Sequence, residues 1–115
     1  MHEVSLVHAL FDQADRAIAP HSSAAVYKVT VRIGALAGVE CELFRTAFEG
    51  VKDDRGYWRA ALEIVEELAA WTCAECGAAI DGAGPLRCGI CQGTPELSAG
   101  GDLILQRLEL EASHV

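Results

Sequence analysis

WTCAECGAAIDGAGPLRCGICQGTPELS, residues 71–98, determines how this chain of 115 residues is organised. The stretch is rich in Gly, Ala and Cys and has few large apolar residues, so it cannot bury a core of its own. Two Cys-x2-Cys pairs, Cys73/Cys76 and Cys88/Cys91, flank residues 77–87. Thiolates at this spacing can hold one ion in a tetrahedron, with bonds of about 2.3 Å for zinc. We therefore predict a metal-stabilised module.

The donor atoms of this module indicate which metal it holds. No histidine lies in the stretch, so the ligand set is expected to be all sulfur. Structural sites with four sulfur ligands in small ribbons are typically zinc, although the spacing does not separate zinc from iron. A reversible dithiol pair is the alternative interpretation. A closed tetrahedral site leaves no open coordination position, so we expect the metal to be structural.

The overall charge of the chain argues against two classes of partner. Lys and Arg total 9 residues against 17 Asp and Glu, which gives a net charge of −8. Such a chain repels a phosphate backbone or an anionic membrane, so we expect neither as a partner. No apolar run reaches the ~18 residues of a transmembrane helix, and the N-terminus lacks signal-peptide features. We therefore expect a cytoplasmic protein, whose cysteines are metal ligands or buried thiols.

Apolar spacing predicts the other elements. Residues 4–18 and 43–51 have helical periodicity, and residues 25–33 alternate with the period of a strand. Residues 59–70 are ambiguous, because their propensity slightly favours a helix while their leucine and isoleucine side chains would share one side of a strand. Residues 102–111 predict a strand covered on both faces. One face has Ile104, Leu108 and Leu110, and the other has Leu103 and Leu105.

Several residues with metal affinity are assigned no ligand role. Cys41 lies at the start of the second predicted helix, where we expect a small thiol buried on the core side rather than a fifth metal ligand. His8, His21 and His114 each stand alone, and a lone histidine is usually structural or solvated.

The first three residues form a second candidate site. The α-amino group of Met1, the peptide nitrogen of His2 and its imidazole Nδ1 can close small adjacent chelate rings on one ion. The result is a planar nitrogen set, which suits Ni(II) or Cu(II) better than Zn(II). The Glu3 carboxylate could supply a further donor or a counter-charge. The geometry permits this site but does not require it.

Together these pieces resemble the HypA/HybF family of hydrogenase nickel-incorporation proteins. The resemblance covers nearly the whole chain in the family's order. The matching stretches are MHEVSL (1–6), VTVRIGALAGVECELFRTAFEG (29–50), ALEIVEELAAWTCAECG (61–77), RCGIC (87–91) and SAGGDLILQRLELE (98–111). Two features depart from the family pattern, namely the segment GVKDDRGYWRA and Cys41, and neither is a ligand position.

The resemblance implies a nickel metallochaperone rather than an enzyme. Such a protein delivers Ni(II) to the [NiFe]-hydrogenase large subunit precursor together with the accessory GTPase HypB, and some members also serve urease. It implies nickel bound by Met1, His2 and Glu3, and structural zinc bound by Cys73, Cys76, Cys88 and Cys91. The recipient enzyme and the formation of a homodimer stay open.

The resemblance also implies an α+β fold and resolves the ambiguous segment. Residues 59–69 become a strand, so we expect a small mixed three-stranded sheet with two helices and an inserted zinc-ribbon-like module. The nickel-binding α/β domain would comprise residues 1–70 and 96–115, and the zinc module residues 71–95.

Two other classes of function are weaker. A basic ribbon studded with aromatic residues would favour a zinc-ribbon adaptor that binds protein or nucleic acid. This ribbon instead contains the acidic residues Glu75 and Asp81 and one basic residue, Arg87. An enzyme would need a catalytic constellation, and the sequence offers neither a serine–histidine–acid set nor a phosphate-binding Gly-Lys motif.

Overall fold

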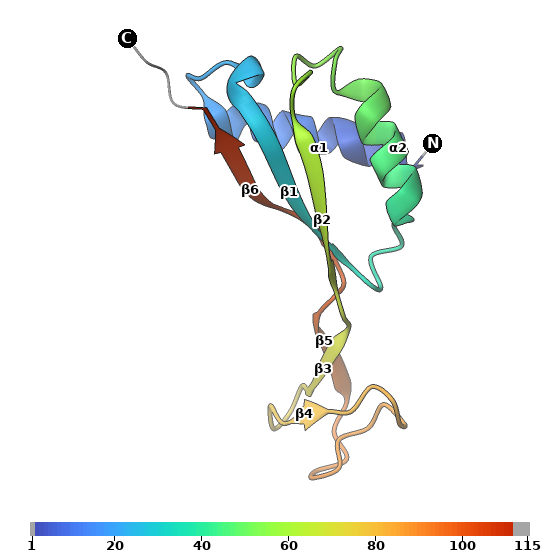
Figure 1. The fold of residues 1–115 in the computed structure, drawn as a ribbon. Helices are drawn as coiled ribbons and strands as arrows, with labels where there is room; N and C mark the ends of the chain where they lie inside the picture. Colours follow the sequence, from blue (N-terminus) through green and yellow to red (C-terminus); the bar gives the residue numbers. More distant parts are fainter. Residues whose placement is uncertain (1, 112–115) are drawn as a thin grey trace.

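The computed structural model describes residues 2–111, which form an elongated molecule with extents of 60 × 32 × 17 Å. Two helices and one sheet make up the larger part, and a second small sheet lies beyond the end of the first (Figure 1). The elements are α1 (His2–Ile18), a 3-10 turn (Ser23–Ala25), β1 (Val26–Gly34), α2 (Cys41–Val51), β2 (Ala61–Glu67), β3 (Ala70–Cys73), β4 (Ala79–Ile80), β5 (Pro95–Ala99) and β6 (Leu103–Leu110).

The larger sheet has the strand order β2-β1-β6. β1 and β2 are parallel because α2 connects them as a crossover, whereas β6 returns antiparallel to β1. The predicted mixed three-stranded sheet with two helices is therefore confirmed. The slight preference for a helix over residues 59–70 is wrong. Leu62 and Ile64 pair with Val29 and Val31 of β1, and burial on the sheet outweighs local helix propensity.

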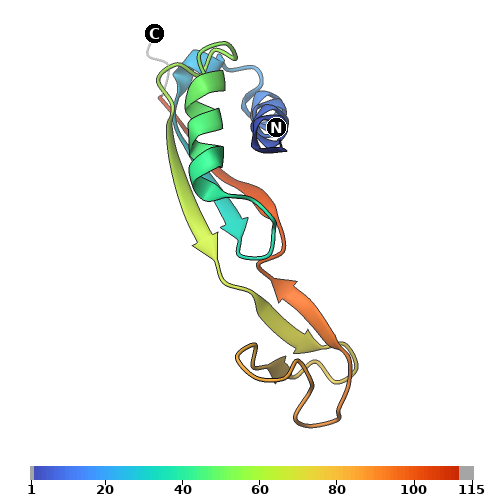
Figure 2. The same cartoon turned by 90° about the vertical axis from the view of Figure 1, so that its right-hand side faces the viewer.

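Both helices cover the same face of this sheet (Figure 2). Alternate β1 residues such as Val29 and Val31 point into the core, where α1 contributes Phe11 and α2 contributes Phe44 and Phe48. The opposite face is polar, with ion pairs such as Lys28–Glu63 at 3.3 Å. The sheet is thus amphipathic, as a sheet with one solvated face should be.

The prediction that the last strand is covered on both faces is wrong. The register of β6 against β1 shifts between Leu105 and Arg107, so Gln106 is an extra bulged residue. The bulge turns the second half of the strand over and brings its leucines onto the core side, while Ile104 is 43% exposed on the other face. The core-facing residues are Leu103, Leu105, Leu108 and Leu110.

The two sheets meet where the backbones of Gly34 and Gly100 come into close contact. A Cβ on Gly34 would clash with the carbonyl carbon and oxygen of Gly100, and Gly100 has a φ of +88°. Leu36 N–H donates to the Gly100 carbonyl at 2.8 Å, and Gly100 N–H donates to Glu67 Oε1 at 2.9 Å. Neither glycine can gain a side chain without moving the strands apart.

This contact yields a test with a matched control. Gly34→Ala should lower the free energy of unfolding by about 1–3 kcal/mol, since the new methyl group meets backbone rather than a movable side chain. Gly50→Ala makes the same chemical change in α2, where nothing lies within 4 Å of the new Cβ. It should raise the stability by about 0.5–1 kcal/mol through helix propensity. Urea unfolding measures both; equal effects of the two substitutions would contradict the described junction.

Candidate metal centres

The four paired cysteines converge at the far end of the small sheet, which has the order β4-β3-β5. Cys73 ends β3, and the chain turns back so that Gly77 N–H donates to the Cys73 carbonyl at 2.9 Å. The second turn is similar, with Gln92 N–H donating to the Cys88 carbonyl at 3.2 Å. Gly77 and Gln92 each follow the second cysteine of a pair, and both have positive φ, at 77° and 62°.

The sulfur atoms of these cysteines form a compact cluster. All four Sγ atoms lie within 4.8 Å of one another, with 3.4 Å between Cys73 and Cys91 and 3.6 Å between Cys76 and Cys88. The edge of a zinc–thiolate tetrahedron is about 3.8 Å, as follows from its bond length. The predicted convergence of the two pairs is therefore present, and it fits a tetrahedral ion with soft ligands.

The four thiols of the cluster differ in pKa, partly because of backbone hydrogen bonds to their sulfurs. The N–H of Cys91 donates to Cys88 and lowers the pKa of that thiol to about 6, and the N–H of Cys76 similarly lowers the pKa of Cys73. In contrast, the sulfurs of Cys73 and Cys76 raise the pKa of Cys91 to about 12. Four adjacent thiols cannot all ionise unaided, so a bound cation is what would stabilise them as thiolates.

Gly93 is a part of this site that the sequence does not reveal. A Cβ at this position would lie 2.5 Å from Cys73 Sγ and 3.1 Å from Cys91 Sγ, and would clash with the Glu75 carboxylate. That carboxylate accepts a hydrogen bond from Thr94 N–H at 3.2 Å and so closes the loop over the sulfurs. The only signal in the sequence is a glycine two residues after the last cysteine, which resembles any loop glycine.

Gly93→Ala should therefore reduce metal retention, because the methyl group occupies space next to two of the sulfurs. Gly84→Ala in the same module is the control, since nothing lies within 4 Å of its Cβ. We expect metal content near one per chain for the wild type and Gly84→Ala, and a clear loss for Gly93→Ala after mild chelation. Mass spectrometry of the intact protein measures this; equal retention by both variants would contradict the packing around Gly93.

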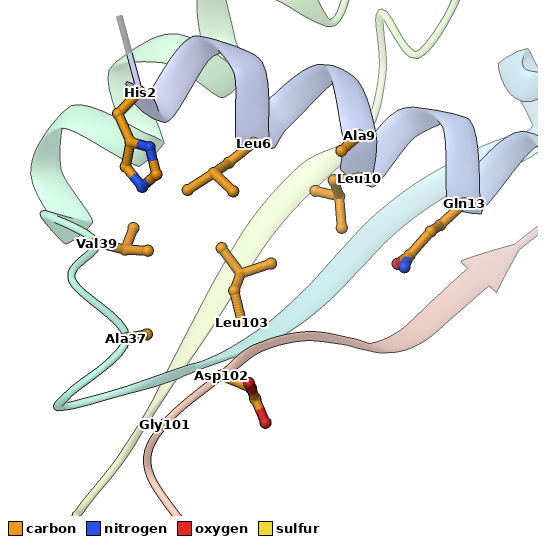
Figure 3. Close-up of a pocket in the computed structure, with 10 residues that line it drawn as sticks. All are labelled: His2, Leu6, Ala9, Leu10, Gln13, Ala37, Val39, Gly101, Asp102 and Leu103. Carbon is orange, nitrogen blue, oxygen red and sulfur yellow. The ribbon is translucent and has the colours of Figure 1, made fainter.

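The N-terminal candidate residues lie at the start of α1, and Met1 is outside the described residues. His2 is the first residue of the helix, and its exposed imidazole points into a cavity of ≈ 290 Å³ (Figure 3). Apolar side chains such as Leu6, Val39 and Leu103 line most of this cavity. Glu3 points instead toward α2, where its Oε2 accepts a hydrogen bond from Glu40 N–H at 3.4 Å.

A polar cluster holds α1 in place from the opposite side. Arg55 donates to Asp12 at 2.7 Å and to Asp15 at 3.2 Å, and its guanidinium also contacts His8 Nδ1 at 3.2 Å. Tyr57 is fully buried, and its hydroxyl donates to Asp15 at 2.6 Å. The pKa of this hydroxyl is raised, mainly by burial and to a lesser extent by the hydrogen bond. Arg55 and Tyr57 belong to the segment GVKDDRGYWRA, which departs from the family pattern. These two residues of the segment therefore hold α1 in place.

The remaining candidates lie apart from the sulfur cluster. Cys41 begins α2 and is partly buried against the core. The pKa of its thiol is raised, mainly by burial and also by the nearby negative charge of Glu66. Among residues 2–111 only the four paired cysteines form a group suited to a metal. His8 contacts Arg55, His21 is exposed after α1, and His114 lies outside the described residues.

The fold and the sulfur cluster define a small α+β protein with a metal-binding ribbon. A family model described as "Hydrogenase/urease nickel incorporation, metallochaperone, hypA" matches residues 1–110. The "Hydrogenase maturation factor HypA" of Shewanella halifaxensis is 34% identical, over 96% of this chain and 98% of its own. The protein of that name from Wolinella succinogenes is 35% identical, over 97% of each chain.

Solved structures agree with this match. The solution structure of the Ni metallochaperone HypA from Helicobacter pylori superposes with a TM-score of 0.76 at 23% identity and covers 96% of this chain and 98% of its own, which shows the shared fold. A further "Solution structure of HypA protein" gives a TM-score of 0.80 at 26% identity and covers 98% of both chains.

The chain belongs to the HypA family of hydrogenase and urease nickel-incorporation metallochaperones. It is therefore a metal-delivery protein rather than an enzyme, and the alternative of an adaptor with no part in nickel incorporation is set aside. Within residues 2–111, no helix combines the length and apolar character needed to cross a membrane.

Proposed function

We propose that this protein binds Ni(II) at its N-terminus as cargo, through the Met1 amine, the His2 peptide nitrogen and the His2 imidazole. The position of His2 as the first residue of α1 is the observation that supports this most strongly. The first N–H groups of a helix have no acceptor within the helix, so the His2 peptide nitrogen is not committed to the helical hydrogen bonds. Its exposed imidazole borders an open cavity, which leaves room for an ion and for the protein that receives it.

Glu3 has a second role in this proposal. Its hydrogen bond to Glu40 N–H joins the start of α1 to the start of α2, where the Glu40 side chain caps the helix by accepting from Glu42 N–H at 3.3 Å. The contact fixes the direction of the first turn of α1. Glu3 then contributes a carboxylate next to the nickel ligands, as a further donor or as a counter-charge.

The sulfur cluster serves a separate, structural purpose. We assign Zn(II) to Cys73, Cys76, Cys88 and Cys91 because the sulfur spacing suits a closed tetrahedron with no position left for cargo. In this proposal residues 71–95 are the zinc module and residues 1–70 and 96–115 the nickel-binding domain. Delivery takes place in the cytoplasm with the GTPase HypB to the [NiFe]-hydrogenase large subunit precursor, and urease is a further recipient class.

The two metals should occupy chemically separate sites. Protein purified without added metal should contain about one zinc per chain, and an equimolar addition of nickel should leave that zinc bound, because soft thiolates favour zinc in a tetrahedron. Cys73→Ala and Cys91→Ala should lose the zinc, whereas Cys41→Ala should retain it. Elemental analysis after gel filtration measures both metals. Displacement of zinc by nickel, or zinc loss in the Cys41 variant alone, would refute the two-site proposal.

Nickel binding should depend on the first residues and on nothing in the zinc module. His2→Ala should weaken nickel binding by orders of magnitude, because the chelate loses its imidazole. The stability should change by at most about 0.5 kcal/mol, since the side chain is exposed. A chain with residues added ahead of Met1 should also bind weakly, because its α-amine has become an amide.

Calorimetric titration of the untagged protein with nickel measures these affinities. His21→Ala is the matched control, since it removes another exposed imidazole just beyond α1 and should leave nickel binding unchanged. Zinc content should stay constant in all variants. Equal nickel affinity in the wild type, the His2 variant and the extended chain would rule out an N-terminal site.

A further inference from the structure

The four cysteines of the ribbon differ in how far they are exposed to solvent. Cys73 is 3% exposed and Cys88 is fully buried, whereas Cys76 and Cys91 are exposed. Each Cys-x2-Cys pair therefore consists of a buried first cysteine and an exposed second one. Because the oxidation of a cysteine depends on its exposure, a small oxidant in solution would reach the second cysteine of each pair first.

Backbone hydrogen bonds hold the two buried sulfurs in place. Cys73 Sγ accepts from the N–H groups of Glu75 and Cys76, both at 3.4 Å. Cys88 Sγ accepts in the same way from two N–H groups of its own turn, also at 3.4 Å. Each buried sulfur thus has a fixed position in its turn and is shielded from solvent there.

Each exposed sulfur lies next to a buried sulfur of the other pair. Cys91 Sγ is 3.4 Å from Cys73 Sγ, and Cys76 Sγ is 3.6 Å from Cys88 Sγ. A disulfide bond is about 2.05 Å long, so each contact has to shorten by only about 1.5 Å to form one. The arrangement therefore places a second sulfur, which can act as a nucleophile, beside each sulfur that an oxidant can reach.

We propose that the ribbon is a site of oxidation by peroxide, which converts its four cysteines to two disulfides that each join one pair to the other. The bonds are Cys73–Cys91 and Cys76–Cys88. The exposed thiolate attacks one peroxide oxygen and becomes a sulfenic acid, while the O–O bond breaks and the other oxygen takes up a proton and leaves as water. The buried thiolate then attacks the sulfenic sulfur, and the S–O bond breaks to release a second water after proton uptake. Each disulfide thus transfers two electrons to one peroxide.

This modification concerns the sulfurs themselves and goes beyond the proposed nickel delivery. Only its consequence for metal content rests on the proposed zinc site. Conversion of all four sulfurs to disulfides leaves no thiolate donor, so bound zinc should be released in proportion to the disulfides formed. Both disulfides join the same two turns of the ribbon, and a thiol reductant should restore the four donors.

Arg87 makes the pairing of the cysteines directly measurable, because it is the only site for trypsin between the two pairs. Trypsin cleavage gives one peptide of residues 60–87 and another of residues 88–107, each with two cysteines. The untagged wild type should be treated with excess hydrogen peroxide and digested without reduction. Mass spectrometry should find the two peptides joined, with fragmentation assigning the bonds as proposed, and reduction should separate them. Disulfides within the pairs would instead leave two separate peptides.

A sulfenic-acid trap tests the order of the steps. Dimedone added together with the peroxide should label Cys76 and Cys91 but neither Cys73 nor Cys88, so each peptide contains its own control. Cys41→Ala should form the same two disulfides as the wild type. Separate peptides before reduction, sulfinic acids in place of disulfides, a bond to Cys41, or dimedone on the buried cysteines would each overturn the proposal. Absence of zinc from the untreated protein would refute the proposed metal alone, since the peptide linkage is measured independently of it.

Discussion

The packing of Phe11 against two other aromatic rings is the interaction on which most of the structure depends. Its ring lies 4.6 Å from that of Tyr57 and 5.2 Å from that of Phe48, and so joins α1 to α2 and to the segment before β2. Arg55 covers the same ring at 5.7 Å from its centre while it binds the acids of α1. This anchor decides where the start of α1 lies, and hence where His2 and Glu3 lie relative to α2.

Two unlike sources of stability operate in this chain. The larger part buries apolar side chains between one sheet face and two helices, so its stability is distributed over many contacts. The ribbon has only a small buried cluster of Cys73, Ile80 and Cys88, with Trp71 packed against it, which is too little apolar burial to stabilise it alone. In the proposed two-site arrangement this separation is useful, because the sulfur donors of the ribbon differ in chemistry and place from the nitrogen donors proposed at the N-terminus.

Local patterns predicted the elements whose own residues decide them. The helical spacing of α1 and α2, the alternation in β1 and the two cysteine pairs all depend on near neighbours in the sequence. The errors arose where distant segments decide the outcome. β2 is a strand because β1 and α2 bury Leu62 and Ile64. Leu108 faces the core side of the sheet because of a bulge in β6 that forms only when this strand pairs with β1. The packing of Gly93 against sulfurs from another turn is invisible for the same reason.

The strand order β2-β1-β6 also affects how the chain acquires its fold. β1 lies near the start of the sequence, yet one of its two partners is made last, so the sheet stays incomplete until residues 103–110 have been synthesised. The intervening segment is a long loop whose closure costs conformational entropy. Pairing of β3 with β5 brings the two ends of that loop side by side, and the metal proposed for the four sulfurs would support this pairing. The availability of metal during synthesis would therefore influence how quickly the sheet is completed, in addition to how stable the ribbon is.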